Sequence, residues 1–383
     1  MFYAQAIRFL HMFRKIFFAG FLALALSAFA QNDISKIDKN FAVEKTDGLD
    51  VVYHNAATAP FVVEGFAWRK DGGSYSRLPK NLDANEVNRG ARDLSSHSAG
   101  GVVRFRTDSP YIVLRAEISS TYTMGHMADT GSSGFDFFCD TNRYLKTVNP
   151  RMNKPQIPTP VVAVLTRNFG KKMRDYSLYM PLYNGVKKLE IGLAPDAKFE
   201  KPTPHKIAKP ILFYGSSITQ GGCASRTSNA YTAMLCRALD APMINLGFSG
   251  SAKGEPKIAE LIASLDLAAF VYDYDYNAPT TEHLKKTHEP FFKIIRKAKP
   301  NLPIIMLSRV SYPSDDRVAV IRATYENAKK AGDKNVYFID GRDLFKDADI
   351  SYLTVDGCHP NDLGFYLMFK NTLPTLKQAI GVK

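Results

Sequence analysis

The sequence predicts two domains, an antiparallel β-sandwich followed by an α/β domain with a parallel sheet. In the first half, short apolar runs are broken by Gly, Asn, Asp and Ser, a pattern typical of an all-β domain. In the second half, strand-like runs alternate with helix-like stretches, which favours a parallel sheet covered on both faces. Between them, residues 194–210 carry four prolines among polar residues, so we expect a linker there.

The first thirty residues have the pattern of a secretory signal. Arg14 and Lys15 precede an apolar run from Ile16 to Ala28, and the small-residue pattern Ala28-Phe29-Ala30 follows. The apolar run is short for a membrane span. We therefore expect a signal peptide over residues 1–30, export to the periplasm or the exterior, and contact with the membrane only through this segment before cleavage. An uncleaved anchor is the alternative.

We assign residues 31–204 to the β-sandwich and residues 205–383 to the α/β domain. Each expected strand of the sandwich is a short apolar or alternating run bounded by turn residues. These runs are Val51–Tyr53, Phe61–Trp68, Gly101–Phe105, Tyr111–Ile118, Phe135–Phe138, Val161–Leu165, Tyr176–Met180 and Lys188–Ile191.

The α/β domain is expected to contain five parallel strands. Its first strand is the apolar and aromatic run that begins at Ile211 and ends near Gly215, and the later strands are Met243–Leu246, Ala269–Asp273, Ile304–Ser308 and Val336–Ile339. The intervening stretches predict helices over Ala230–Leu239, Ile258–Leu265, Pro290–Ala298, Asp316–Ala331 and Gly364–Ile380.

Charge and cysteine content exclude several classes of protein. The formal net charge is +13, but the basic residues are scattered, and no basic run with interleaved aromatics indicates a nucleic-acid partner. Four cysteines are too few for a disulfide scaffold, and their spacing indicates no metal site. We expect free thiols; a bridge between Cys223 and Cys358 is the alternative, because export makes one possible. Nothing in the sequence indicates an oligomeric state.

Four stretches of the second half carry polar residues that could form one site. Ser217 lies just beyond a buried strand, where open α/β sheets bind ligands. Asp356 precedes His359 by three residues, so its carboxylate could orient the ring and leave the other ring nitrogen free to act as a base. Gly250 and Asn277 follow two other strands and could supply an N–H and an amide to an oxyanion.

These stretches in this order resemble the SGNH (GDSL-type) hydrolase family. The matching segments are Gly215-Ser216-Ser217-Ile218-Thr219, Asn245 to Gly250, Asn277, and Asp356-Gly357-Cys358-His359. On this resemblance Ser217 is the nucleophile, Asp356 and His359 complete a catalytic triad, and Ser217, Gly250 and Asn277 form the oxyanion hole. Two departures are Ser216, where the family usually has Asp, and Ala278, where the family commonly has the Asp of its Gly-x-Asn-Asp pattern.

The first half adds to the resemblance. Gly134-Phe135-Asp136-Phe137-Phe138 is similar to the Gly-x-Asp-Leu-Tyr motif of a β domain that precedes such hydrolases in a two-domain bacterial branch. The resemblance implies a jelly-roll-like sandwich followed by a flavodoxin-like α/β/α domain. His126 lies in a loop-like segment just upstream, and it could be a packed contact between domains or part of a substrate-binding lip over the site.

The resemblance implies an exported serine esterase that works through an acyl-enzyme and needs no cofactor. The expected partner is a small-molecule or saccharide ester, and O-deacetylation of carbohydrates is the first expectation. A lysophospholipase or short-chain acyl esterase, or an acyltransferase, is the alternative within the enzyme class. A glycan-binding protein with an inactive hydrolase half is the alternative outside it.

Overall fold

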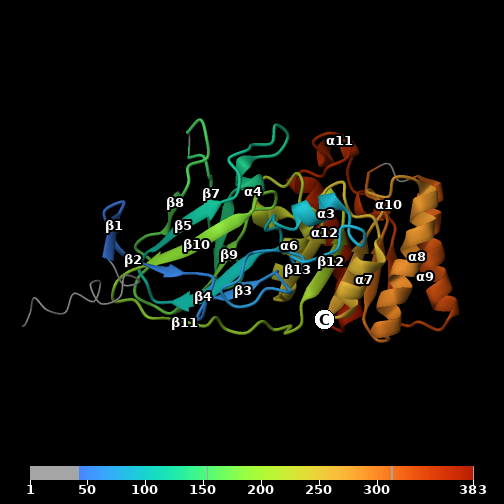
Figure 1. Cartoon of the computed structure of the whole chain (residues 1–383), viewed down its shortest axis with the longest axis horizontal. Helices are drawn as coiled ribbons and strands as arrows, with labels where there is room; N and C mark the ends of the chain where they lie inside the picture. The colour runs from blue at the N-terminus through green and yellow to red at the C-terminus, as the bar shows by residue number, and fades with distance from the viewer. Residues whose placement is uncertain (1–42, 153, 312–313, 383) are drawn as a thin grey trace, which may run out of the picture.

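The computed structural model describes residues 43–152, 154–311 and 314–382. The predicted signal peptide, residues 1–30, lies outside these residues. The chain forms a β domain and an α/β domain that lie side by side, with the first strands of the β domain at one end of the molecule and helices of the α/β domain at the other (Figure 1). The predicted two-domain fold is confirmed.

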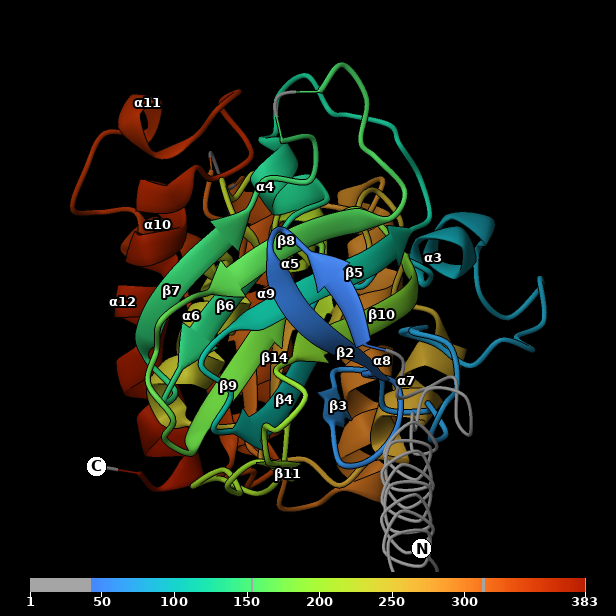
Figure 2. The ribbon, with the colours of Figure 1, turned by 90° about the vertical axis from the view of Figure 1, so that its left-hand side faces the viewer.

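The β domain consists of two antiparallel sheets. One has the strand order β1-β2-β10-β5-β8, and the other has the order β11-β4-β9-β6-β7, with β3 paired to β4. Figure 2 views the molecule from this side, with the helices of the other domain behind the strands. The strands are β1 (Val43–Thr46), β2 (Leu49–Asn55), β3 (Val62–Glu64), β4 (Val102–Thr107), β5 (Ile112–Ile118), β6 (Phe135–Cys139), β7 (Arg143–Val148), β8 (Val161–Thr166), β9 (Arg174–Tyr179), β10 (Val186–Leu193) and β11 (Phe199–Glu200).

The core of the β domain lies between its two sheets. Along β8 every second residue is buried, as expected of a strand with one face on a core. Phe105, Phe137 and Tyr176 stack there, with ring centroids 5.3 Å apart for Phe137 and Tyr176. These three come from neighbouring strands of one sheet, so a ladder of aromatic rings ties that sheet together.

The α/β domain contains a five-stranded parallel sheet of order β13-β12-β14-β15-β16. This is the flavodoxin-like order, with β12 in the position where the strand order reverses. Residues of β12, β13 and β14 are all buried, which explains why their sequences are continuous apolar runs. The strands are β12 (Ile211–Gly215), β13 (Met243–Gly247), β14 (Ala269–Asp273), β15 (Ile304–Leu307) and β16 (Val336–Ile339), so the predicted five strands are confirmed.

Helices cover both faces of this sheet. The larger ones are α6 (Tyr231–Leu239), α7 (Pro256–Ala263), α8 (Thr281–Ala298), α9 (Asp315–Lys330) and α12 (Asp362–Ile380). The predicted start of α8, at Pro290, is wrong. The helix begins nine residues earlier because the Thr280 side chain accepts a hydrogen bond from His283 N and caps it there. Within the described residues, no helix is long and apolar enough to span a bilayer.

Three strands of the β domain were not predicted because their sequences lack an apolar run. β1 and β7 are largely exposed and polar, and β11 has only two residues. The run predicted over Phe61–Trp68 forms a strand only at Val62–Glu64. Trp68 lies beyond that strand, half-buried against the core of the α/β domain.

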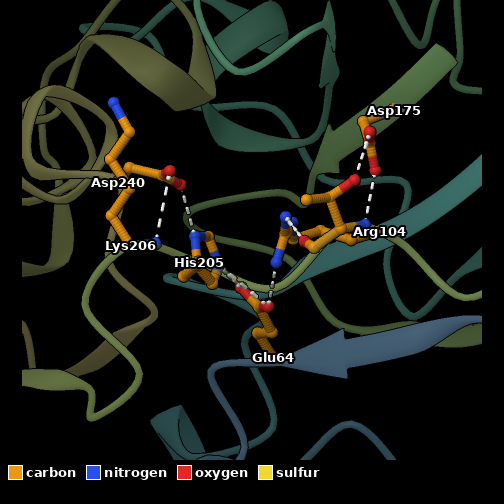
Figure 3. A network of polar contacts seen from close by, with 7 residues as sticks. Glu64, Arg104, Asp175, His205, Lys206 and Asp240 are labelled. Atoms are coloured by element: carbon orange, nitrogen blue, oxygen red, sulfur yellow. Dashed lines mark hydrogen bonds and ion pairs between the residues drawn. The ribbon is translucent and has the colours of Figure 1, made fainter.

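The predicted linker is fixed to both domains. After β11, residues 201–210 contain no regular secondary structure. His205 lies between two carboxylates, with Nδ1 2.7 Å from Asp240 Oδ1 and Nε2 3.0 Å from Glu64 Oε1 (Figure 3). Arg104 of β4 donates to Glu64 and to the carbonyl of Thr203. This network, residues 64, 104, 205 and 240, joins the β domain to the α/β domain near Met243, where β13 begins.

Candidate active site

Ser217 is the first residue of α5 (Ser217–Gln220), directly after β12. The turn from strand to helix is tight: a Cβ on Gly215 would lie 2.2 Å from Thr219 Oγ1 and 2.3 Å from Asp273 O. The Ser216 side chain caps the helix by accepting from Ile218 N at 3.1 Å. Ser217 itself is 9% exposed. The turn therefore presents the serine hydroxyl at the carboxyl edge of the sheet, beside the first N–H groups of a helix.

Ser217, His359 and Asp356 form a continuous chain of hydrogen bonds. Ser217 Oγ lies 2.9 Å from His359 Nε2, and His359 Nδ1 lies 2.7 Å from Asp356 Oδ2. Partial burial alone would raise the pKa of Asp356, but hydrogen bonds from His359 and from Cys358 N lower it to about 2. The carboxylate is thus ionised at neutral pH and can accept the Nδ1–H, which leaves Nε2 as an acceptor for the serine proton.

The turn that carries Asp356 and His359 is held by its own backbone. Asp356 Oδ1 accepts from Cys358 N at 2.9 Å and from His359 N at 2.7 Å. Gly357 has φ +80°, which favours glycine, and Val355 N donates to His359 O. The turn follows the short helix α11 (Ile350–Leu353), and Asn361 then caps α12. One carboxylate therefore fixes both the turn and the ring of the histidine.

Gly250 and Asn277 follow the two strands that flank β12, namely β13 and β14. Gly250 is in the turn after β13, exposed and with φ +67°. Asn277 follows β14, and its Nδ2 donates to Phe248 O at 2.7 Å. An amide nitrogen carries two hydrogens, so one remains to donate elsewhere. Gln220 Oε1 accepts from Ser249 N at 3.0 Å and ties this turn to α5. The structure thus brings the turn that carries Gly250, with Asn277 bonded to it, next to the helix that carries Ser217.

His126 of the β domain lies beside His359. The two ring centroids are 6.2 Å apart, and His126 is exposed. Its segment precedes α4 (Asp129–Ser132), which is fixed to the α/β domain by a hydrogen bond from Thr130 Oγ1 to Ser225 O. Figures 1 and 2 both show α4 and α11 at the same edge of the molecule. The ring is therefore at the rim of the site and is not buried between the domains.

Sequence reasoning missed most residues that support the site. Tyr183 OH donates to Ser217 O at 3.1 Å, so the β domain contacts the nucleophile residue directly. Asp273 accepts from Thr219 Oγ1 at 2.8 Å and from Tyr231 OH at 2.9 Å beneath α5. Burial raises the pKa of Asp273 to about 7, partly offset by these two hydrogen bonds. An acidic residue at the end of an otherwise apolar, buried strand is the sequence signal for this structural role.

Asp275, the next acidic residue along the chain, is also structural. It accepts from Arg317 Nε at 2.8 Å and from Arg309 N at 3.0 Å. Asp136, in the motif of β6, is fully buried and accepts from Ser228 N and Oγ in the α/β domain. The carboxylate of the Gly-x-Asp motif therefore joins the two domains.

All four cysteines are free thiols. Cys223 N donates to Pro360 O, so Cys223 lies near the turn that contains Cys358, but no disulfide joins them. Burial raises the pKa of the Cys223 thiol to about 12. Across the described part of the chain, no group of three or more His, Cys, Asp and Glu side chains could hold a metal ion.

Two family models match the chain in tandem. Residues 51–199 match the N-terminus of SGNH-hydrolase-type esterases, the GxDLY domain, and residues 208–377 match the GDSL-like lipase/acylhydrolase family. Together with the fold, these matches define a two-domain esterase. The chain belongs to the SGNH (GDSL-type) hydrolases, in the branch that carries a GxDLY domain. No curated protein matches the chain in sequence.

Solved structures share the whole two-domain arrangement. A protein from Bacteroides ovatus described as a GDSL-like lipase is 28% identical, with a TM-score of 0.75 over 87% of this chain and 99% of that one. The salicylyl-acyltransferase SsfX3 from a tetracycline biosynthetic pathway is 21% identical, with a TM-score of 0.71 over 87% and 98%. An acetyl xylan esterase, Est2A from Butyrivibrio proteoclasticus, is 15% identical, with a TM-score of 0.56 over 86% and 99%. At 21% and 15% identity, the last two similarities establish a shared fold and nothing about activity.

Proposed function

We propose that this protein is an exported serine esterase that removes O-acetyl groups from carbohydrates through an acyl-enzyme. The observation that carries the proposal is the unbroken chain of hydrogen bonds from Ser217 Oγ through His359 to Asp356. Its geometry fits the roles of nucleophile, general base and orienting carboxylate.

In the proposed reaction, Ser217 Oγ attacks the ester carbonyl while His359 Nε2 takes the hydroxyl proton. Asp356 stabilises the imidazolium that forms, because its carboxylate stays ionised. The same proton then goes to the departing alcohol oxygen, which leaves an acetyl group on Ser217. Water, deprotonated by His359, attacks this acyl-enzyme and releases acetate.

The tetrahedral intermediates carry a negative oxygen that needs hydrogen-bond donors. The backbone N–H groups of Ser217 and Gly250 and the second hydrogen of Asn277 Nδ2 are the proposed donors. Asn277 is suited to this role because Phe248 O orients its nitrogen and Lys253 Nζ donates to its backbone carbonyl at 2.7 Å. These donors are fixed before substrate binds, so they need no reorganisation during the reaction.

Three observations support a saccharide acetate as substrate. The signal-like segment 1–30 indicates export, where polymeric glycans are found. The fold is shared with an acetyl xylan esterase. His126 is exposed beside His359, and Tyr122, 74% exposed, lies in the same loop. An aromatic ring and an imidazole suit a sugar that stacks and forms hydrogen bonds. We therefore include His126 as a substrate-binding residue.

The fold is also shared with a salicylyl-acyltransferase, so acyl transfer to an acceptor other than water is the second candidate. A lysophospholipid or short acyl ester is the third. No cofactor takes part in the proposed mechanism, and the membrane is contacted only through the signal segment before its removal.

The test measures acetate released from acetylated xylan, and p-nitrophenol released from its acetate and palmitate esters. Wild type is compared with Ser217→Ala and with His126→Ala. The proposal expects acetate release that vanishes in Ser217→Ala, and a KM for acetylated xylan that rises in His126→Ala while p-nitrophenyl acetate is cleaved as before. Cleavage of palmitate alone would favour a lipid substrate. If no product is released from any of these substrates, the esterase assignment is wrong and the glycan-binding alternative is supported.

A further inference from the structure

Arg77 is a fully buried arginine at the boundary of the two domains, with 0% of its side chain exposed. It belongs to an arm of the β domain, residues 74–100, that runs along the α/β domain and includes α3 (Arg89–Leu94). Arg77 Nε donates to His97 O at 2.9 Å and Nη2 donates to Leu94 O at 2.7 Å, both within the arm. These bonds fix the guanidinium to its own domain.

The other end of the guanidinium reaches the α/β domain at the carboxyl end of β13. Arg77 Nη1 donates to Asn245 O at 3.2 Å and to Gly247 O at 2.5 Å. Its Cζ lies 4.7 Å from the centroid of the Phe248 ring, a cation–π contact. The arginine thus contacts the last residues of the strand and the first residue of the turn that carries Gly250.

The charge of Arg77 has no carboxylate partner among the described residues. Every hydrogen bond of the guanidinium goes to a backbone carbonyl. Burial lowers the pKa of Arg77 to about 9, which still leaves the group charged at neutral pH. A buried charge without a counter-ion is costly, and carbonyl dipoles offset only part of that cost. Stability alone therefore does not explain why an arginine occupies this position.

A second contact from the arm holds the far side of the same turn. Asn88 Nδ2 donates to Ser251 O at 2.8 Å. Gly90 packs so closely that a Cβ there would lie 2.2 Å from Ser251 Oγ. The turn from Phe248 to Ser251 is therefore held before Gly250 by Arg77 and after it by Asn88. Phe248 O also accepts from Asn277 Nδ2, so two of the three proposed oxyanion donors, the Gly250 N–H and the Asn277 amide, depend on where this turn lies.

We propose that Arg77 is a positioning residue of the β domain that holds the turn Phe248–Ser251, and with it the Gly250 N–H and the Asn277 amide, in place for the oxyanion. The inference rests on the proposed function and adds to it a role for the β domain in catalysis.

The network around Arg104 offers a matched control (Figure 3). Arg104 is also a nearly buried arginine that joins the two domains, with 8% exposed, but it lies near Met243, where β13 begins. Met243 and Gly247 are the two ends of β13, about 13 Å apart at 3.3 Å per residue, so the Arg104 network lies near the start of the strand and Arg77 contacts its end. Only Arg77 contacts the turn that carries Gly250.

The experiment compares Arg77→Lys with Arg104→Lys in the full two-domain protein, with p-nitrophenyl acetate as substrate. Lysine keeps the positive charge, but its ammonium cannot donate hydrogen bonds to several carbonyls in the fixed planar geometry of a guanidinium. We expect Arg77→Lys to lower kcat about 10- to 100-fold with little change in KM, because a misplaced donor weakens only the transition state. Arg104→Lys should lower Tm but leave kcat within about twofold of wild type.

A double-mutant cycle with Asn277→Ala separates positioning from general destabilisation. If Arg77 acts through the oxyanion donors, the two losses in kcat should overlap, so that the double variant loses about tenfold less than the product of the single losses. If Arg77→Lys does not fold, Phe248→Leu takes its place, because it removes the ring below the guanidinium and keeps an apolar side chain.

Two results would overturn the inference: a kcat for Arg77→Lys equal to that of Arg104→Lys, or losses that multiply fully in the double variant. Failure of the proposed function itself would look different. In that case wild type would cleave no ester and would not react with a fluorophosphonate. The inferred role of Arg77 in catalysis would then be wrong as well.

Discussion

Ser217 Oγ and His359 Nε2 lie 2.9 Å apart although 142 residues separate them in the chain. The contact closes because β12 and the turn before α12 both end at the carboxyl edge of the parallel sheet. Both partners are held by backbone before they meet, the serine by the turn into α5 and the histidine by the Asp356 turn. Such preorganisation is what a nucleophile and its base require.

Asp356→Asn should lower kcat about a hundredfold or more, because an amide orients the imidazole less reliably and cannot stabilise its charged form. The carboxylate pKa of about 2 lies below the ordinary value, so any stability that its ionisation adds is present above pH 4 and lost as the pH falls towards 2. The decrease of kcat/KM on the acid side of the pH profile should therefore not reflect the titration of the Asp356 carboxylate, because this group stays ionised above pH 4.

The control for this prediction is Asp349→Asn. Asp349 is a nearby acid that caps α11 through Ser351 N, a role that asparagine also fills. The pH profiles of both variants are measured from pH 4 to 9 in steady state. Equal activity of the two variants would contradict the assigned role of Asp356.

Asn277→Ala should lower kcat by about two to three orders of magnitude and leave KM nearly unchanged, because the amide would act on the oxyanion and not on the ground state. Steady-state kinetics on p-nitrophenyl acetate provide the measurement, with exposed Asn327→Ala on α9 as control. A loss expressed mainly in KM would mean that Asn277 binds the substrate instead.

Asp273→Asn should change how stability depends on pH. The pKa of Asp273 is raised to about 7, so the folded protein keeps a proton that the unfolded chain releases near pH 4. Stability from this group is therefore full below pH 4 and is lost as the pH rises to about 7. Asparagine cannot ionise, yet its carbonyl can still accept from Thr219 and Tyr231.

Urea unfolding of wild type and Asp273→Asn at pH 5, 6, 7 and 8 measures this difference. The variant should lose less stability than wild type between pH 5 and pH 7. Parallel curves for the two proteins would show that Asp273 is ionised throughout and that its carboxylate is stabilised in another way.

Gly247→Ala should impair both stability and turnover. A Cβ at Gly247 would lie 2.2 Å from Gln220 N and 2.6 Å from Thr219 C, so α5 would have to move away from β13. We expect a loss of about 1–3 kcal/mol in the free energy of unfolding, typical of overpacking, together with reduced kcat. Gly125→Ala is the control, since nothing lies within 4 Å of its added Cβ. A Tm and kcat equal to those of the control would refute the close packing.

The parts of the fold that the sequence predicted are those with strong local signals. The continuous apolar runs of β12, β13 and β14 are buried on both faces of the sheet, which is why they could be located to within a residue. The candidate residues of the site follow such strands or lie in short turns with Gly, and turn chemistry is local as well. The polar strands β1 and β7 offered no such signal.

The contacts between domains could not be predicted, because no local pattern encodes them. Arg77 and Gly247 are 170 residues apart, and the two carboxylates on His205 come from Glu64 and Asp240. In sequence each is an ordinary polar residue in a loop or at a strand end. Only the packing of the arm 74–100 against β13 makes Arg77 a buried residue next to the proposed oxyanion turn.

The most direct test of the central claim is labelling with a fluorophosphonate, followed by mass spectrometry of the peptides. A fluorophosphonate reacts with a serine only when a base activates it and donors stabilise the phosphoryl oxygen. The account predicts one labelled peptide, modified at Ser217 in wild type and unlabelled in Ser217→Ala and His359→Ala. Labelling at another serine, or no labelling of a folded wild-type protein, would contradict it.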